Sequence, residues 1–139
     1  MPLNPLGGRF TIQTGMYSDQ LLDHFQNPRN PGEVSDPDAI VEIENPACGD
    51  VLRLSLKIED GRIAEIRFKA MGCVASMACG SALTELVAGR TLDEVRSLNR
   101  ENSIRETLIA DVGGLPQASS HAAQLALDAL SAALNKLKP

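Results

Sequence analysis

Residues 52–70 read LRLSLKIEDGRIAEIRFKA, and this stretch decides the fold. In its first half apolar and polar residues alternate, which is the period of a strand with one buried face. Asp60-Gly61 follows as a two-residue turn, a pair suited to central positions that need positive φ. The second half returns as a strand with these residues expected to face inward: Ala64, Ile66, Phe68 and Ala70. The stretch predicts an antiparallel hairpin with one side covered by helices and the other side facing water.

The segments on either side of the hairpin supply one more strand and the helices. A strand is expected over 39–44, and a helix over 19–26 with Ser18 as its N-cap. Apolar spacing and capping residues predict four further helices. The first covers 74–88 and ends at Gly89, and the second begins at Thr91. The third covers 102–110, and the last runs from Ser119 or Ser120 to about 137. The predicted fold class is α+β, a three-stranded antiparallel sheet with helices packed on one face. Residues 16–139 are expected to form a single domain, and residues 1–15 a flexible N-terminal arm.

Composition excludes several kinds of function. Of the 139 residues, 43% are hydrophobic and 22% charged, which is ordinary for a globular domain. Three Phe, one Tyr and no Trp leave few rings for base stacking, and a net charge of -5 disfavours binding to a phosphate backbone. No run approaches the ~18 apolar residues that span a bilayer, and the N-terminus has no signal pattern. We expect a cytoplasmic protein that binds neither nucleic acid nor membrane, with cysteines that are free, catalytic or metal-bound.

Four residues form a candidate metal site. Cys48 and Cys73 each lie beside a glycine, and the tight turn between them should return the chain to the same end of the sheet. Cys73 also opens a helix, where the helix dipole favours a thiolate. Asp50 adds a carboxylate, and His121 adds an imidazole if the last helix packs its N-terminus against that end. Two sulfurs, one nitrogen and one oxygen suit Zn²⁺ or an iron–sulfur centre.

Each of these residues also has an ordinary structural explanation, and from the residues alone the alternatives stay open. The two glycine-flanked cysteines and Asp50 can be turn residues, and His121 can be a solvated helix cap. Cys79 lies on the apolar stripe of its helix, so we expect it to be a buried and inert thiol. His24 is expected on the surface or facing a partner.

From Met16 onward the chain resembles the U-type iron–sulfur cluster assembly scaffolds, the family of IscU, SufU and the N-terminal domain of NifU. The motifs that carry the resemblance are Tyr17-Ser18, DHFQNPRN at 23–30, NPACGD at 45–50, FKAMGC at 68–73, GRTLDE at 89–94, Leu115-Pro116 and His121. They occur in the order of the family and span most of the chain. The fold that the resemblance implies, a three-stranded antiparallel sheet with helices packed on it, agrees with the fold predicted above.

The resemblance also implies a role and a site. In this family a cluster is assembled on three cysteines plus an aspartate or histidine, a cysteine desulfurase delivers the sulfur, and acceptor proteins receive the cluster. By position, Cys48 and Cys73 match the first two cysteines, Asp50 matches the aspartate, and His121 matches the histidine. The expected cargo is a [2Fe–2S] cluster or iron, with Zn²⁺ as an alternative occupant of the apo form. The resemblance implies a protein that is not an enzyme, and it leaves open whether the chain forms a homo-oligomer.

Two positions depart from the family pattern. The third cysteine should follow His121, but this chain has Ala122. Cys79 lies six residues after Cys73 on a helix, so the two do not share a face and Cys79 is not expected to replace the missing thiol. Residues 115–119 read LPQAS where the Isc branch has the Leu-Pro-Pro-Val-Lys segment for its chaperone, so chaperone docking is not predicted.

Three hypotheses follow from these observations. The leading one is a divergent scaffold that binds metal or cluster through the four residues of the candidate site. The second is a non-assembling regulatory module that docks on a cysteine desulfurase through residues 16–32 and the turn near Cys48. The weakest is an enzyme with Cys73 as nucleophile and His121 as base, for which the sequence supplies no oxyanion site or substrate pocket.

Overall fold

The computed structural model describes residues 17–46 and 49–137. It is an α+β fold, as predicted, with the elements in the following order. They are α2 (Asp19–Gln26), β1 (Ala39–Glu44), β2 (Val51–Glu59), β3 (Arg62–Met71), α3 (Val74–Val87), α4 (Leu92–Arg100), α5 (Ser103–Asp111), the short 3₁₀ helix η1 (Gln117–Ser119) and α6 (Ser120–Lys136). The predicted arm at residues 1–15 lies outside the described residues.

The sheet is built on the predicted hairpin. Its strands are antiparallel throughout, in the order β1-β2-β3. Asp60 and Gly61 connect β2 to β3 with φ values of 54° and 76°, which confirms the two-residue turn. Because this turn is tight, Val51 at the start of β2 pairs with Met71 at the end of β3. The segments just outside these two residues therefore leave the sheet at the same end.

The inward residues of β3 were predicted with one error. Ile66 and Phe68 are buried as expected, whereas Ala64 is exposed and Ile63 is buried instead. The cause is an irregularity in the β2–β3 pairing next to Lys57, which shifts the register by one residue. A shift of one residue turns every later side chain to the opposite face of the sheet.

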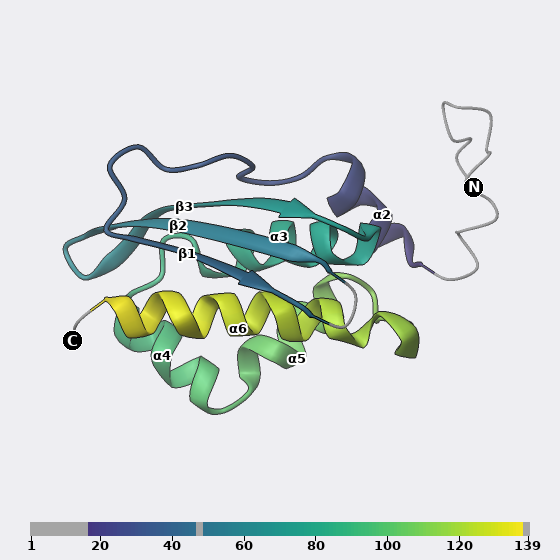
Figure 1. Cartoon of the computed structure of the whole chain (residues 1–139). Coiled ribbons are helices and arrows are strands. Elements are labelled where there is room, and N and C mark those ends of the chain that lie inside the picture. Colours follow the sequence, from purple (N-terminus) through teal and green to yellow (C-terminus); the bar gives the residue numbers. More distant parts are fainter. Residues whose placement is uncertain (1–16, 47–48, 138–139) are drawn as a thin grey trace.

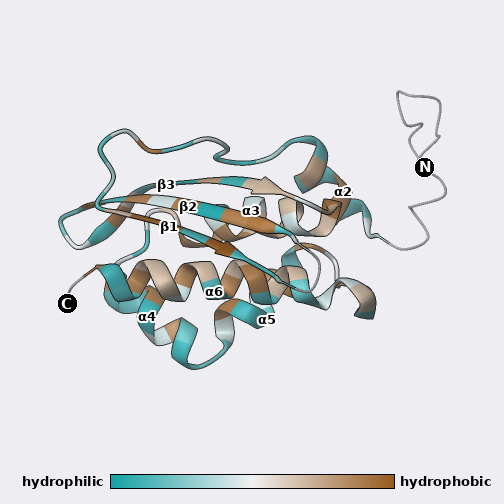
Figure 2. Cartoon of the chain, viewed as in Figure 1, coloured by the Kyte–Doolittle hydropathy of each residue, from teal (hydrophilic) through white to brown (hydrophobic). Residues whose placement is uncertain are grey.

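The helices cover one face of the sheet, as predicted. In Figure 1, α3 and α6 lie against the same side of the three strands, and α4 and α5 lie on the far side of α6. Helix α3 packs on β3 and against α2, and α6 packs on β1 and β2. Figure 2 shows apolar bands on α3, α6 and the strands, and mostly hydrophilic residues on α4. Within the part of the chain that the structure describes, no helix is long and apolar enough to cross a membrane.

The opposite face of the sheet is drier than the alternating pattern suggests. The loop between α2 and β1 crosses this face, where the backbone N–H of Val34 donates to the hydroxyl of Ser55 at 2.9 Å. Both residues are buried, although Ser55 was expected to face water. A covering loop of this kind leaves no periodic pattern, so the alternation in β2 could not reveal it.

Two loops bond to the free edge of β3. The backbone of Gly32 donates to the carbonyl of Phe68 at 2.8 Å, and the N–H of Phe68 donates to the carbonyl of Asn30 at 3.1 Å. Near the start of the strand, the N–H of Gly89 donates to the carbonyl of Ile63 at 2.8 Å. The outer edge of β3 is therefore occupied by backbone at two separate points.

The two long helices differ in how well their burial was predicted. In α6 and at its C-cap Leu137, the apolar residues that recur with the helical period are all buried, as the predicted helix requires: 122, 125, 126, 129, 130, 133, 134 and 137. Helix α3 is instead buried on most of its circumference, beyond the predicted stripe, and includes the polar residues Ser76, Ser81 and Thr84. A Cβ built at Gly80 would lie 2.7 Å from the ring of Phe68, so glycine allows α3 to approach β3 closely.

His24 is not on the surface, which corrects the prediction. His24 is 6% exposed, and its Nδ1 lies 2.8 Å from the hydroxyl of Ser81 on α3. Burial is the main cause that lowers the pKa of His24 below its ordinary value of 6.5, and the positive charge of Arg29 lowers it further. The nearby carboxylate of Glu85 acts in the opposite direction but does not prevent the decrease.

The burial of His24 predicts a pH dependence of stability. In the unfolded chain this imidazole takes up a proton near pH 6.5, whereas in the folded chain it does so only at a lower pH. The unfolded state thus binds more protons between the two values, and the free energy of unfolding should fall as the pH drops below about 6.5. Each unit by which the pKa is lowered corresponds to about 1.4 kcal/mol of stability lost in acid.

Urea denaturation of the wild type and a His24→Asn variant between pH 5 and pH 8 measures this effect. The variant keeps a polar atom near the position of Nδ1 but has no proton to gain in this range. We expect its stability to depend less on pH than that of the wild type. Equal slopes in the two proteins would contradict the assignment of this pH dependence to His24.

Candidate metal centre

The end of the β2–β3 hairpin brings the candidate residues together. Asp50 directly precedes β2, and Gly72-Cys73 directly follows β3. The first residue of β2 pairs with the last residue of β3, so Asp50 and Cys73 lie at the same end of the sheet. Cys73 is also the N-cap of α3. His121 lies in the first turn of α6, and the packing of α6 along β1 and β2 places this turn at the same end of the sheet. Of the four predicted residues, Cys48 lies outside the described part of the chain.

The three described residues are in mutual contact. The Sγ of Cys73 lies 3.1 Å from Oδ2 of Asp50 and 3.8 Å from Nε2 of His121. The same Nε2 lies 3.3 Å from Oδ2 of Asp50. Within residues 17–46 and 49–137, this is the one cluster of at least three such side chains whose ligand atoms all lie within 4.8 Å of one another. The condition placed on His121, that α6 should point its N-terminus at this end, is therefore met.

The Asp50 carboxylate is buried and held from two sides. Its residue is 4% exposed. The backbone N–H of Cys73 donates to Oδ1 at 3.2 Å, and the hydroxyl of Ser76 donates to Oδ2 at 2.6 Å. Ser76 was not predicted from the sequence. Its position three residues after Cys73 places it on the same side of the helix start, and this spacing is the signal that could have indicated it.

Gly72 leaves the space that Asp50 occupies. Its φ is +132°, a backbone conformation that residues with a Cβ rarely adopt. A Cβ built at this position would lie 2.1 Å from Oδ1 of Asp50. The glycine before Cys73 is therefore required by the approach of the carboxylate, in addition to the turn that it makes.

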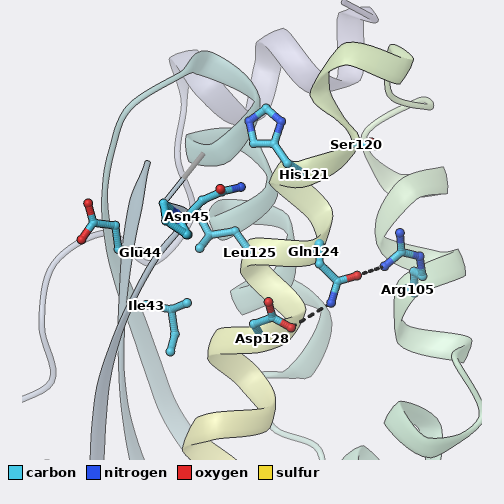
Figure 3. Close-up of a pocket in the computed structure, with 10 residues that line it drawn as sticks. Ile43, Glu44, Asn45, Arg105, Ser120, His121, Gln124, Leu125 and Asp128 are labelled. Atoms are coloured by element: carbon cyan, nitrogen blue, oxygen red, sulfur yellow. Dashed lines mark hydrogen bonds between the residues drawn. The ribbon is translucent and has the colours of Figure 1, made fainter. Parts of the chain in front are cut away.

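The centre is open to solvent on the side of His121, whose side chain is 31% exposed. Beside it lies a pocket of about 420 Å³ between the end of β1, α5 and α6, shown in Figure 3. On the wall of this pocket Arg105 donates to Gln124 at 2.7 Å, and Gln124 donates to Asp128 at 2.8 Å. An ion or a partner side chain could approach His121 from this side without disturbing the core.

The donor set fits a transition metal. A thiol, an imidazole and a carboxylate are the three side-chain types that bind Zn²⁺ in proteins, and thiolates also bind iron–sulfur clusters. Oδ2 of Asp50 is so near the sulfur of Cys73 that two negative charges there would repel each other without a cation nearby. The same proximity argues against Cys73 as a free nucleophile with His121 as its base, although that pair is in contact.

The remaining cysteine of the described chain, Cys79, is buried, as predicted. Cys79 is fully buried in the core, and burial raises the pKa of its thiol to about 12. A thiol in this environment does not ionise at neutral pH and does not bind metal readily. Ala122, at the position where the third cysteine was expected, is 1% exposed and follows His121 directly in α6.

Known proteins match this chain along most of its length. The model of the NifU-like N terminal domain family matches residues 16–139. The chain is 42% identical over 119 residues to "Iron-sulfur cluster assembly scaffold protein IscU 1" of Archaeoglobus fulgidus, covering 86% of this chain and 74% of that protein. It is 40% identical over 126 residues to the scaffold protein IscU of Escherichia coli K12, covering 88% of this chain and 94% of that protein.

Solved structures show the same fold. A NifU-like protein (N-terminal) from Brucella abortus superposes with a TM-score of 0.73 at 21% identity, covering 89% of this chain and 95% of that one. At this identity the likeness establishes the fold alone, and the relatives at 40% and 42% identity carry the family assignment. The architecture, the motif order and the family match lead to one conclusion: the chain belongs to the NifU-like N-terminal domain family, that of the IscU-type scaffolds.

Proposed function

We propose that the protein is an iron–sulfur cluster assembly scaffold that binds the cluster as its cargo and passes it to acceptor proteins. The observation that carries this proposal is the convergence of Asp50, Cys73 and His121, whose ligand atoms lie within 4.8 Å of one another in a chain of this family. The relatives compared above are named as scaffold proteins, which supports a binding role rather than catalysis.

The proposed ligands are Cys48, Asp50, Cys73 and His121. The two cysteines would supply thiolates to iron, and His121 and Asp50 would complete the coordination with one nitrogen and one oxygen. The cargo is a [2Fe–2S] cluster or iron, and Zn²⁺ fits the same donors in the apo form. Of the described ligands, His121 is the one that lines the pocket, so a group arriving through the pocket would meet it first.

The proposed partners follow from the chemistry of the cargo. A cysteine desulfurase would supply the sulfur, and acceptor proteins would receive the finished cluster. Both would reach the centre from its open side, in the cytoplasm. We do not propose docking of a chaperone, because residues 115–119 read LPQAS.

A second function is favoured by Ala122. Without a third cysteine, the chain could bind a cysteine desulfurase and regulate it without assembling clusters. The two functions differ in one result, which is whether a cluster forms on the protein when the desulfurase is active. Scaffold activity is the better supported of the two, because the three described ligand candidates remain in contact.

The test is elemental analysis after anaerobic purification, followed by reconstitution with Fe²⁺, cysteine, a cysteine desulfurase and dithiothreitol as the reductant that converts persulfide sulfur to sulfide. For a scaffold we expect about one bound Zn²⁺ or Fe per chain before reconstitution. During reconstitution, absorbance from sulfur-to-iron charge transfer should appear. The Cys48→Ser, Cys73→Ser double variant is the blank. Metal retained by the blank, or a wild type that binds the desulfurase and never develops the absorbance, would rule out the scaffold.

A further inference from the structure

Ser76 is a buried polar residue beside the metal centre that is not one of the proposed ligands. It lies in the first turn of α3 and is 2% exposed. Its hydroxyl donates to Oδ2 of Asp50 at 2.6 Å and lies 3.4 Å from the sulfur of Cys73. Of the three polar contacts described for Oδ2 of Asp50, the one with the hydroxyl of Ser76 is the shortest. The thiol of Cys73 lies at 3.1 Å and the imidazole of His121 at 3.3 Å.

Metal binding would break two of these three contacts to Asp50 and leave the third. Cys73 and His121 bind a metal through the same Sγ and Nε2 that now approach Asp50, so both contacts would give way to bonds with the ion. The hydroxyl of Ser76 has no such competing task. The backbone N–H of Cys73, which donates to Oδ1, has none either. With a metal bound, Oδ1 would keep the N–H of Cys73 as a donor and Oδ2 would keep the hydroxyl of Ser76. One donor on each oxygen fixes the plane of the carboxylate.

We propose that Ser76 is a positioning residue that holds the Asp50 carboxylate in the orientation in which it binds the metal. The inference rests on the proposed metal centre and deepens it. A ligating carboxylate that is itself hydrogen-bonded needs no reorientation when the ion arrives, and loss of such an outer partner typically weakens metal binding ~10–100-fold. A hydroxyl suits this task because it adds no charge beside the ligands.

The alternative role for Ser76 is structural. A buried carboxylate needs hydrogen bonds whether or not a metal ever binds, and removal of one donor would then lower stability alone. Ser81 supplies the matched control, because it is fully buried on the same helix and its hydroxyl is also used by neighbouring groups. Those groups are Nδ1 of His24 and the backbone N–H of Arg29, each at 2.8 Å. Neither belongs to the metal centre.

The experiment compares the wild type with Ser76→Ala and Ser81→Ala in the full chain. Zn²⁺ affinity is measured by competition with a chromophoric chelator, Co²⁺ absorption reports the ligand geometry, and urea denaturation of the apo proteins reports stability. We expect Ser76→Ala to weaken Zn²⁺ binding by about 10-fold or more and to shift the Co²⁺ d–d bands. Ser81→Ala should lower stability while leaving the affinity and the spectrum as in the wild type.

The outcomes separate this inference from the proposed function. If the wild type binds Zn²⁺ and Ser76→Ala matches it in affinity and in Co²⁺ spectrum, the positioning role is wrong and the metal centre stands. If both serine variants lose affinity equally, the effect is one of stability and the role is also wrong. A wild type that binds neither Zn²⁺ nor Co²⁺ overturns the centre and the role of Ser76 together.

Discussion

Replacing Gly72 with alanine is expected to weaken Zn²⁺ binding by more than about 100-fold, beyond the usual effect of losing one outer hydrogen bond. The reason is steric. The new Cβ would lie 2.1 Å from Oδ1 of Asp50, so the carboxylate cannot stay in place, and it would lie 3.0 Å from the Cα of Asp50, which makes the contact with the backbone tight as well. Asp50 would have to leave the position where it contacts Cys73 and His121.

The Gly72→Ala variant should also be less stable. Its φ of +132° belongs to a region that costs on the order of 1–3 kcal/mol for a residue with a Cβ. Loss of affinity must therefore be separated from loss of stability. Gly89→Ala is the control, because φ there is +82° and a Cβ at that position would have no neighbouring atom within 4 Å. It should be destabilised without losing metal.

Zn²⁺ titration and urea denaturation of both glycine variants measure the two effects. The steric account predicts that affinity falls in Gly72→Ala alone, whereas stability falls in both. Tight Zn²⁺ binding by Gly72→Ala would mean that Asp50 is not a ligand, and the coordination would have to be assigned without it.

Replacing Ala122 with cysteine is expected to raise the yield and lifetime of the cluster several-fold. A third thiolate beside His121 would give the centre the ligand that the family pattern predicts. Thiolate sulfur is the usual protein ligand of iron–sulfur clusters, so it should bind iron more strongly than a water or an oxygen donor in the same place. Ala122 is in the first turn of α6, directly after His121.

The burial of Ala122 makes a matched control possible at the next residue. Ala122 is 1% exposed, and the neighbouring Ala123 is fully buried, so a cysteine at either position brings a similar packing change. Only the thiol at 122 should add a ligand, because successive residues on a helix point about 100° apart. Charge-transfer absorbance after reconstitution, and its decay in air, are the measurements. Equal absorbance in Ala122→Cys and Ala123→Cys would show that the added sulfur does not act as a ligand.

Local features of the fold could be predicted from the sequence because neighbouring residues determine them. Asp60-Gly61 set the hairpin, and with it the pairing of β2 and β3. The hydroxyl of Ser18 accepts from the N–H of Leu21 at 2.9 Å, and that of Thr91 accepts from Glu94 at 3.0 Å, as expected of N-caps. For this reason the bounds of α2 and the start of α4 agree with the prediction.

Features that depend on distant contacts could not be predicted. His24 is buried because Ser81, 57 residues later, offers a partner for its ring. The register shift beside Lys57 changed the inward residues of β3, and no turn residue indicated it. Burial on most sides of α3 likewise reflects neighbours from α2, β3, α5 and α6, whereas a periodic stripe describes only one contact face.

The candidate site was predictable only where local features of the chain determine it. The hairpin argument placed Cys48 and Cys73 at one end of the sheet. Cys48 lies outside the described residues, but Asp50, two residues after it, is found at that end against Cys73. The position of His121 depended on the direction in which α6 docks, which only the packed structure shows. Ser76 became visible only once Asp50 was known to be buried.

The occupied edge of β3 restricts how other chains can attach to this molecule. An exposed strand edge can pair with a foreign strand, whether in a fibril or in a peptide complex. Here the carbonyls of Phe68 and Ile63 already accept hydrogen bonds from loops of the same chain. A visiting strand would first have to displace both loops, so pairing of a foreign strand along β3 would cost these hydrogen bonds.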